Sequence, residues 1–474
     1  MKNKVLKFFV LIMAVVMALS VGVMFAACGE NSPYDLKIAV VHKEYGQRWI
    51  NALARKFEEE TGLVVEVEAN PNLQSEIPNR LQNGSDDDLF FSHGITWELY
   101  AAQGMLEPLD DLYEMEVSDG VTFGSKVLPQ FRTAARFNDH YYKVAWTNGT
   151  GGLVYNKKMF EDYGWSVPTV YSNPANPTCD PNVGAVGLLE LCEVILDDTN
   201  GDVKPFVWSS ETYYWDHVVF DWWAQLAGVD KIEAYTQLGS PEVFNPTTSP
   251  EQKEALKAWK NLIADHPEYS MEDCAGKQYT AAQMEFVTGR AAMIPCAQWL
   301  ESGMMGNYDE STCVMDLMPT PFIDGAKTDE NGDPIAVNYS VGSTNSGDSI
   351  LIPADAPHKD TAKQFLVFMF RDDNLKLFSE ETYGVQLAAD YSNVTLDDEA
   401  TDFMKSVYNI NANSQKFDLL SSAMPVLEGF LSLDWPIEGV QHYASLVADP
   451  NTDIDALYQS NYESIVSRWS EWFE

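Results

Sequence analysis

Residues 35–69 alternate short apolar runs with a longer amphipathic one. Residues 35–42, "DLKIAVVH", have the short apolar core of a buried strand. Residues 47–62 follow with apolar side chains three and four positions apart, which predicts a helix ending at Gly62. Residues 63–69, "LVVEVEA", predict the next strand. A strand–helix–strand order indicates a parallel sheet with helices on its faces.

The same alternation continues further along the chain. Residues 87–92 predict another strand, and residues 143–164 predict strand, Gly-rich break, strand and helix. We expect the chain to cross between two lobes in that second segment. Beyond it, helices dominate as far as residue 300. The main predicted segments are a helix over 209–228 with Ser210 as N-cap, a helix over 249–267 with Pro250 at its first position, a helix and strand over 280–300 broken at Gly289, and a strand, turn and helix over 348–372.

The amino terminus has a different pattern. Three lysines precede an apolar run over 8–27 that ends in small residues, which is the layout of a secretory signal. The run is also long enough to span a bilayer, so an uncleaved anchor is the alternative. Residues 25–28, "FAAC", resemble a bacterial lipobox, although Phe25 stands where leucine is usual. We therefore expect a lipoprotein signal peptide over 1–27, a lipid anchor on Cys28 and a tether over 28–34.

Size and charge narrow the possibilities for the exported part. The 447 residues from Cys28 onward exceed what one core usually takes, so we expect two lobes. We assign 35–147 and 301–371 to lobe 1, and 148–300 and 372–474 to lobe 2. Removing a signal with three lysines and no acid changes the net charge from −41 to −44. This charge disfavours nucleic acid and anionic ligands and favours a neutral or cationic ligand, although solubility alone would also account for it.

No cofactor or metal site is predicted. Asp198, Asn200 and Asp202 hint at a calcium loop, but Val203 stands where the motif needs glycine, so we interpret 197–205 as a turn. The odd number of cysteines beyond Cys28 leaves at least one unpaired, and their pairing stays open. These cysteines are Cys179, Cys192, Cys274, Cys296 and Cys313.

Five phrases in a fixed order carry a family resemblance. They are "FEEETGLVVEVE", "DDLFFSHGITWELYAAQGMLEPLDDLYE", "YYKVAWTNGTGGLVYNKKMFEDYGWSVP", "FVTGRAAMIPCAQWL" and "ILIPADAPHKDTAKQFLVFMF". In this order the chain resembles family 1 extracellular solute-binding proteins, the receptors of carbohydrate-importing ABC transporters, which include maltose-binding protein. It departs from them at 171–187 and in a longer hairpin at "FIDGAKTDENGDPIAVNYS".

The resemblance implies an α/β fold of the type II periplasmic-binding-protein kind. Each of its two lobes is a mixed sheet flanked by helices, the lobes are hinged at crossing strands, and the ligand lies in the cleft between them. Open α/β sheets bind ligands beyond the carboxyl ends of their strands, in agreement with this placement. The resemblance also implies a monomer without enzymatic activity, whose partners are a small carbohydrate and the permease of an ABC transporter.

Candidate ligand-binding residues follow from the chemistry of a sugar. Its apolar faces need flat aromatic side chains, and its hydroxyl rim needs polar ones. Trp299 is the principal candidate, because the family places a stacking tryptophan there. Trp222 has core spacing with Trp215 and is assigned to the core, while Trp97 and Glu44 could also be a core residue and a solvated charge. The other candidates are Glu44, Tyr45, Ser92, His93, Trp97, Trp146, Asn148, Thr150, Trp208, Tyr213, Ser343, Asn345 and Trp435.

Three functions are compatible with the sequence. The first is a lipid-anchored receptor on the outer face of a cell membrane, at a Gram-positive exterior, that captures a neutral sugar or oligosaccharide for an ABC importer. The second is an exported glycoside hydrolase, which needs two carboxylates facing each other across a cleft. With 71 acidic residues, some such pair is always available. The third is a receptor for a polyamine or a metal, which needs converging carboxylates rather than tryptophans.

Overall fold

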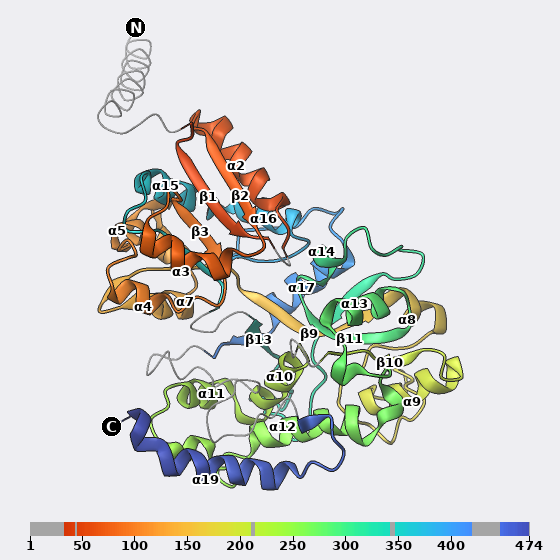
Figure 1. Cartoon of the computed structure of the whole chain (residues 1–474). Helices are drawn as coiled ribbons and strands as arrows, with labels where there is room; N and C mark the ends of the chain where they lie inside the picture. The colour runs from red at the N-terminus through yellow and green to blue at the C-terminus, as the bar shows by residue number, and fades with distance from the viewer. Residues whose placement is uncertain (1–32, 43–44, 210–213, 342–346, 420–445, 474) are drawn as a thin grey trace.

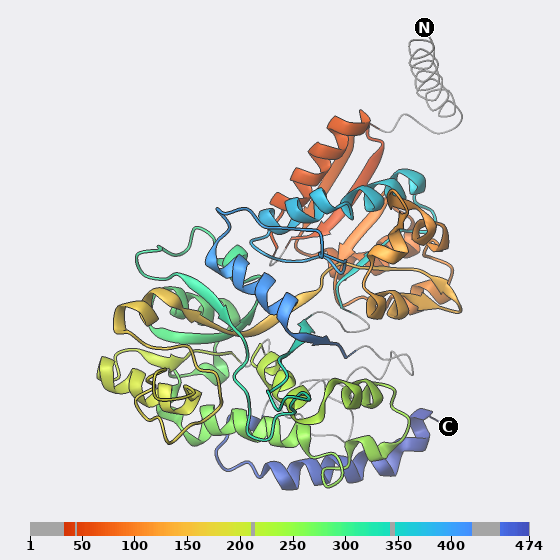
Figure 2. The same ribbon diagram turned by 180° about the vertical axis from the view of Figure 1, so that it is seen from behind.

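The computed structural model describes residues 33–42, 45–209, 214–341, 347–419 and 446–473, and has an α/β fold. Its helices and strands form two bodies, each built around its own sheet (Figure 1). Figure 2 shows the same division from behind, with the carboxyl-terminal helix on the second body. Within the described ranges, no helix is both long and apolar enough to cross a membrane.

The first sheet has the strand order β2-β1-β3-β14-β8. β1 runs parallel to β2 and β3, whereas β14 runs antiparallel to β3 and β8. The strands are β1 (Leu36–Val41), β2 (Val65–Asn70), β3 (Leu89–Ser92), β8 (Val144–Ala145) and β14 (Ser349–Leu351). This mixed sheet contains the parallel unit that the sequence predicted.

Helix α2 (Arg48–Thr61) joins β1 to β2, as predicted. Trp49, Leu53 and Phe57 are buried along one stripe, which faces the core of the first body. Gly62 ends the helix in the left-handed conformation, with φ of 75°, and its backbone N–H donates to the carbonyl oxygen of Glu58 over 2.8 Å. Phe57 packs edge-on against two phenylalanines of α15 (Lys359–Met369), which attaches a late segment of the chain to the first body.

The rest of the first body consists of short elements around this sheet (Figure 1). They are α3 (Leu73–Asn83), α4 (Trp97–Ala102), α5 (Asp110–Glu114), α6 (Phe123–Lys126), α7 (Pro129–Ala134), α16 (Asp372–Glu381), the hairpin of β4 (Glu116–Ser118) and β5 (Val121–Thr122), and the hairpin of β6 (Arg136–Phe137) and β7 (His140–Tyr141).

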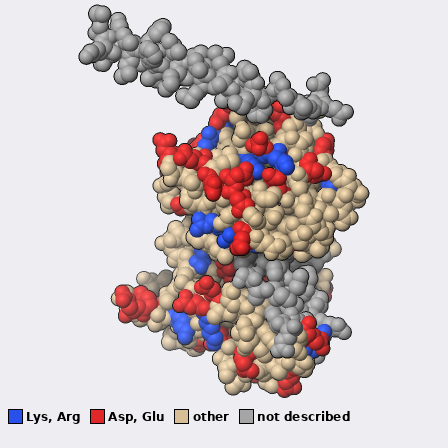
Figure 3. All heavy atoms as spheres, turned by 90° about the vertical axis from the view of Figure 1, so that its left-hand side faces the viewer, with Lys and Arg blue, Asp and Glu red and all other residues tan. Residues whose placement is uncertain are grey.

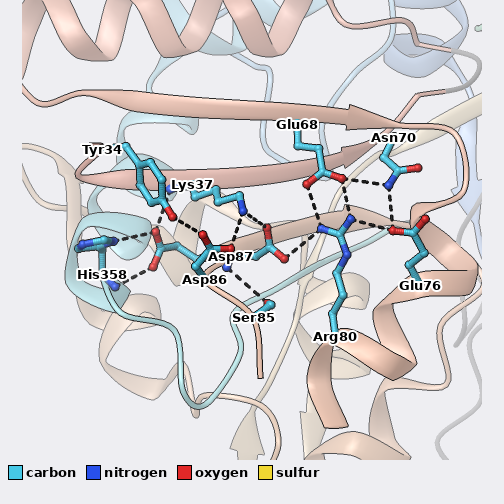
Figure 4. A network of polar contacts seen from close by, with 11 residues as sticks. Tyr34, Lys37, Glu68, Asn70, Glu76, Arg80, Ser85, Asp86, Asp87 and His358 are labelled. Carbon is cyan, nitrogen blue, oxygen red and sulfur yellow. Dashed lines mark hydrogen bonds and ion pairs between the residues drawn. The ribbon is translucent and has the colours of Figure 1, made fainter. Parts of the chain in front are cut away.

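A network of ion pairs lies along one edge of the first body (Figure 4). The Lys37 ammonium lies 2.5 Å from the carboxylate of Asp86, which also accepts a hydrogen bond from the Tyr34 hydroxyl. The Arg80 guanidinium donates two hydrogen bonds to Glu68, at 2.6 and 3.1 Å. Acidic side chains are spread over both bodies on the face shown in Figure 3. The network uses two basic side chains to hold several of these acids and ties Tyr34 to the sheet.

The second sheet has the strand order β10-β11-β9-β13-β15, and β12 also pairs with β9. The central strand β9 is antiparallel to β11, β12 and β13, whereas β10 runs parallel to β11 and β15 parallel to β13, so this sheet is also mixed. The strands are β9 (Gly149–Asn156), β10 (Lys204–Phe206), β11 (Ala291–Ala297), β12 (Met315–Met318), β13 (Val337–Val341) and β15 (Gln415–Phe417).

Helices surround the second sheet and form most of the second body (Figures 1 and 2). They are α8 (Lys157–Tyr163), α9 (Leu188–Thr199), α10 (Asp216–Ala227), α11 (Val229–Thr236), α12 (Glu251–Lys260), α13 (Tyr279–Val287), α14 (Leu300–Met304), α17 (Asp402–Asn413) and α19 (Ile454–Phe473), with a π-helix over Asn261–Asp265 and 3-10 turns over Pro241–Phe244, Pro267–Tyr269 and Cys274–Gly276.

Three connections between described elements pass from one body to the other. The chain leaves the first sheet after β8 and enters the second at β9, as the sequence predicted. It returns between β13 and β14, and it leaves again between α16 and α17. Backbone contacts join two of these connections, because Thr147 and Leu387 form a β-bridge. The passages are the points about which two such bodies can move as hinged units.

Several predicted boundaries differ from the structure. The helix expected over 209–228 begins at Asp216, and Ser210 lies outside the described residues. The helix expected over 249–267 begins at Glu251 with Pro250 as its N-cap, and α12 ends at Lys260, where a π-helix continues. The domain division remains a prediction. Residues 315–318 and 337–341, which the prediction assigned to lobe 1, pair with strands of the second sheet. Helix α15, also assigned to lobe 1, packs beside α2 in the first body.

Candidate ligand-binding site

The first passage between the bodies brings two predicted site residues together. Tyr45 and Trp146 pack edge-on, with ring centroids 5.2 Å apart. The Tyr45 hydroxyl donates to a carboxylate oxygen of Asp348 over 3.2 Å, and the Thr147 hydroxyl donates to the same oxygen. Asp348 immediately precedes β14, so these contacts join the first passage to the second. Trp146 itself is only 1% exposed and also packs against Trp49.

Two further candidates join the first passage to the third. The Asn148 backbone N–H donates to the carbonyl oxygen of Gln386 over 2.9 Å. The Thr150 hydroxyl donates to the amide oxygen of Asn411 over 2.5 Å, and the Asn411 amide donates to Gln386 over 2.9 Å. Asn148 and Thr150 are both buried. All three passages therefore meet near the start of β9.

Trp299 lies on the second body, two residues beyond the end of β11. Its indole is 9% exposed and packs edge-on against Tyr214 and His217, with centroid distances of 5.2 and 6.1 Å. Gln298, the preceding residue, donates its backbone N–H to the carbonyl oxygen of Thr150 over 2.8 Å. The antiparallel pairing of β11 with β9 thus holds Trp299 beside the first passage.

A glycine in β9 leaves room for the His217 ring. A Cβ atom at Gly151 would lie 2.6 Å from His217 Nδ1, which is closer than such atoms can approach. The His217 ring also lies 6.0 Å from the Tyr339 ring on β13. Burial lowers the pKa of His217 to about 3, so the imidazole is neutral at ordinary pH. The Gly-rich break in the sequence is therefore the place where His217 approaches the sheet.

In the part of the chain that the structure describes, seven buried polar side-chain atoms of this region have no hydrogen-bond partner. Buried polar groups are normally hydrogen-bonded, and each one left unpaired costs about 1–3 kcal/mol. Several unpaired atoms in one region indicate a place where a ligand or water supplies the partners. Ser340 belongs to the group because it pairs across the sheet with Thr150. The atoms are Trp146 Nε1, Asn148 Oδ1, His217 Nδ1, Gln298 Oε1 and Nε2, Trp299 Nε1 and Ser340 Oγ.

Two charged side chains beside this region are occupied by contacts within the protein. The Asp221 carboxylate accepts hydrogen bonds from the Thr320 hydroxyl at 2.5 Å and the Tyr339 backbone N–H at 2.7 Å. The Lys416 ammonium donates to the carbonyl oxygen of Gly149 and to the side-chain oxygen of Asn338, both at 2.8 Å. Burial raises the pKa of Asp221 to about 7 and lowers that of Lys416 to about 7. Lys416 therefore fastens β15 to β9 and β13, and Asp221 fastens α10 to β13.

Other predicted site residues lie apart from Trp299 or outside the described residues. Trp97 is 1% exposed, as its alternative assignment to the core required, and Trp208 donates its indole N–H to Ser270 over 3.0 Å. Ser92 is fully buried at the end of β3, followed by the half-buried His93. These residues remain predictions. Glu44, Tyr213, Ser343, Asn345, Trp435 and the lipidation candidate Cys28 lie outside the described residues.

The structure adds His217, Gln298, Ser340 and Asn411 to the candidates. Gln298 directly precedes Trp299, and this adjacency was an available signal. Trp222, which was assigned to the core, is fully buried and donates its indole N–H to the Pro321 carbonyl over 2.8 Å. Of the segment 197–205, which was expected to be a turn, residues 197–199 end α9 and residues 204–205 begin β10. The turn lies between them and starts at Asn200, which takes up the left-handed conformation.

Comparison with known proteins identifies the family. The profile of the bacterial extracellular solute-binding proteins matches residues 42–376. The chain belongs to this family. Solved structures similar to this solute-binding protein share its two-lobed fold along nearly their whole length. The solute-binding protein RafE in complex with raffinose has a TM-score of 0.61 at 17% identity, over 91% of this chain and 98% of the other. Maltose-bound MalE3 of T. maritima has a TM-score of 0.62 at 18% identity, over 91% and 99%. The predicted fold class is confirmed.

Curated relatives match this solute-binding protein at low identity. It is 25% identical over 410 residues to the xylose/arabinose-binding protein XacG of Haloferax volcanii, covering 83% of this chain and 77% of that protein. It is 24% identical over 328 residues to an uncharacterised ABC transporter extracellular-binding protein of Pyrococcus horikoshii, covering 67% of this chain. The match spans 64% of the length of the Pyrococcus protein, slightly less than two thirds.

Proposed function

We propose that this solute-binding protein captures a neutral sugar or oligosaccharide between its two lobes and delivers it to the permease of an ABC importer. The observation that carries the proposal is the group of seven unpaired buried polar atoms around Trp299 and the start of β9. This location agrees with the rule that ligands bind between lobes beyond strand ends in open α/β folds. XacG, named for xylose and arabinose, and raffinose-bound RafE support a carbohydrate as the cargo.

The unpaired atoms fit hydroxyl groups better than they fit ions. Trp299 Nε1 and Trp146 Nε1 can only donate and Asn148 Oδ1 can only accept, whereas a nitrogen of a neutral imidazole such as His217 Nδ1 donates or accepts according to the tautomer. A sugar hydroxyl both donates and accepts, so a polyhydroxylated ligand can satisfy such a mixed set. The carboxylate of Asp221, a buried acid of this region, already accepts hydrogen bonds from the protein, and the Asp216 carboxylate lies 3.5 Å from His217 Nε2. A polyamine or a metal ion would need acceptors that carry charge.

Binding in this region requires the two bodies to move apart and close again. Trp299 is 9% exposed and the seven polar atoms are buried, so a ligand cannot reach them in the conformation described. Three passages join the bodies, and the contacts of Tyr45, Thr147 and Asn411 bind those passages to one another. Closure over the ligand would couple binding to lobe movement, because contacts with both lobes exist only in the closed form.

A thermal-shift screen of the purified protein against a panel of neutral saccharides tests the proposal. A ligand present at about 100 times its Kd stabilises the folded state by about 2.7 kcal/mol, so the correct sugar should raise the Tm. Trp299→Ala should abolish that rise. Trp165→Ala is the matched control, because Trp165 is 8% exposed but belongs to the α8–α9 region of the second body. Its own Tm should fall, while the rise caused by the sugar should persist.

Three outcomes of the same screen count against the proposal. If no saccharide changes the Tm and a polyamine or a divalent metal does, the cargo is wrong. If oligosaccharides stabilise the protein but are cleaved on prolonged incubation, the protein is a glycoside hydrolase. If Trp299→Ala and Trp165→Ala respond equally to the sugar, then the ligand binds away from Trp299.

We also infer that Cys28 carries a lipid that holds the receptor on the outer face of the cell membrane. The lipobox-like residues 25–28 support this inference, together with the extracellular nature of the family. Two or more acyl chains on one cysteine suffice for stable anchoring, whereas one chain is marginal. Cys28→Ser in the producing cell should therefore move the protein from the membrane fraction to the medium. Retention of that variant in the membrane would instead support the uncleaved anchor.

A further inference from the structure

Three side chains of types that can ligate metals come together in the second body, between α9 and the 3-10 turn that contacts the edge strand β10. Glu193 is on α9, His266 precedes the 3-10 turn Pro267–Tyr269, and Glu268 lies within that turn. One donor atom from each of the three lies within 4.8 Å of the donor atoms of the other two. Segments more than 70 residues apart in the sequence thus supply one compact set of donors.

One tyrosine fixes the orientation of two of these side chains. The His266 imidazole stacks flat on the Tyr269 ring, with centroids 4.7 Å apart and an interplanar angle of 4°. The Tyr269 hydroxyl donates to the Glu193 carboxylate over 2.5 Å. Tyr269 therefore holds these donors in place before any ion arrives, as outer-shell partners of metal ligands commonly do. Tyr269 is 2% exposed and cannot readily move away.

The accessibility and surroundings of the group suit a cation. The His266 Nδ1 atom lies 3.1 Å from a carboxylate oxygen of Glu268. Both glutamates are exposed and His266 is half-buried, so an ion in solution can reach the donors. The strongly acidic chain, with a net charge of −41, raises the local concentration of cations around it.

The types of donor select among the cations. One imidazole nitrogen with two carboxylates suits Zn²⁺, which accepts nitrogen and oxygen ligands in tetrahedral sites. Ca²⁺ and Mg²⁺ prefer oxygen ligands alone, and in larger number. Two carboxylates also balance the charge of one divalent ion. Three protein ligands leave a fourth position for water, as in an open zinc site.

We propose that Glu193, His266 and Glu268 bind one Zn²⁺ ion, which fastens α9 to the turn Pro267–Tyr269. The site is separate from the proposed sugar site, because all three ligands belong to the second body and, among the described residues, their contacts are with one another and with Tyr269 rather than with Trp299. The zinc ion is a structural clip rather than transported cargo. The proposal does not rest on the proposed function.

Zinc titration of the full chain without an affinity tag tests this site, after treatment with a chelator and in an excess of MgCl₂. Isothermal titration should give one Zn²⁺ per chain, and zinc should raise the Tm. Glu193→Gln and His266→Asn should each lower the affinity at least about tenfold, and Tyr269→Phe should lower it about tenfold by releasing the ligands. His140→Asn is the matched control, because His140 pairs with Asp110 at 2.9 Å on the first body without a third ligand. The His140→Asn variant should bind zinc with the same affinity as the parent.

A second readout separates a lost ligand from a damaged fold. Co²⁺ bound at the site should give visible absorption bands that His266→Asn abolishes while far-ultraviolet circular dichroism stays unchanged. Zinc binding that is equal in the parent, Glu193→Gln and His266→Asn would overturn the proposal. Displacement of the zinc by millimolar Mg²⁺, or many weak sites instead of one, would overturn it as well.

Discussion

Replacing Gly151 by alanine adds a single methyl group at the point where β9 faces the candidate site. The new Cβ would lie 2.6 Å from His217 Nδ1 and 2.9 Å from a methyl carbon of Val341. The His217 ring cannot simply swing away, because it packs against the rings of Trp299 and Tyr339. The methyl group must therefore displace the histidine, the strand or both.

The size of the effect follows from two opposing terms. Overpacking a close-packed interior costs about 1–3 kcal/mol, and two contacts below 3 Å place Gly151→Ala in the upper part of that range. Alanine restricts the unfolded chain more than glycine does, and this lower conformational entropy stabilises the folded state by about 0.4–1 kcal/mol. We expect a net loss of about 1–2 kcal/mol. Gly149→Ala should cost more, about 3 kcal/mol or above, because its Cβ meets the backbone carbonyl of Val341 in the paired strand β13.

Thermal unfolding of the three variants Gly149→Ala, Gly151→Ala and Gly239→Ala checks this order. A loss of 1 kcal/mol shifts the Tm by about 2–4 °C for a domain of 150–250 residues. Gly239 is the control, because a Cβ there meets nothing within 4 Å, and its variant should melt at the parent temperature or slightly above. Gly151→Ala should also bind the sugar more weakly, since His217 is displaced. A Gly151→Ala protein with parental Tm and parental sugar affinity would refute the reasoning.

Two further predictions concern buried titratable groups. Burial raises the pKa of Glu301 from 4.5 to about 7, so its ionisation costs stability progressively as the pH rises through that interval. Glu301→Gln can still accept the hydrogen bond from the Thr401 hydroxyl. In chemical denaturation it should therefore be more stable than the parent by about 1–3 kcal/mol at about pH 8 and equal to the parent near pH 4.5. The control Glu399→Gln, at an exposed position, should show no difference at either pH. Burial also raises the pKa of the Cys179 and Cys274 thiols to about 11 and that of Cys313 to about 12. A thiol reagent at about pH 8 should leave these three cysteines unlabelled in the folded protein and label them in denaturant, and labelling of any of them in the folded protein would contradict this.

Local patterns predicted the first body well. Trp49, Leu53 and Phe57 placed α2 within a residue of its observed start and end, because a single face packs against the sheet and Gly62 stops the helix. The predicted start of the helix over 209–228 was wrong, since α10 begins at Asp216. Ser209, in the segment before α10, donates its hydroxyl to the Lys277 carbonyl over 2.6 Å. A contact across 68 residues leaves no periodic signal.

The candidate site was predicted only in part, since its geometry depends on strand pairing. Trp299 was named through family resemblance, and the structure places it beside β9. Ser340 was missed because only the register of β13 against β9 brings it opposite Thr150. His217 was missed because it lies on α10, and tertiary packing brings its ring to Trp299 and Tyr339. Gln298 was missed although it directly precedes Trp299. Trp146 was correctly expected at the passage, but the sequence could not show that its ring packs with Trp49 in the core of the first body. Position along a strand predicts proximity to the site and does not predict which way a side chain points.

The most direct test of the central claim is a crystal structure of this protein with the saccharide that raises its Tm most. The account predicts one sugar ring against the indole of Trp299, with its hydroxyls bonded to His217 and Gln298 and both bodies in contact with the ligand. A saccharide bound outside the space between the bodies, or one that leaves the polar atoms of Gln298 and His217 unpaired, would contradict it.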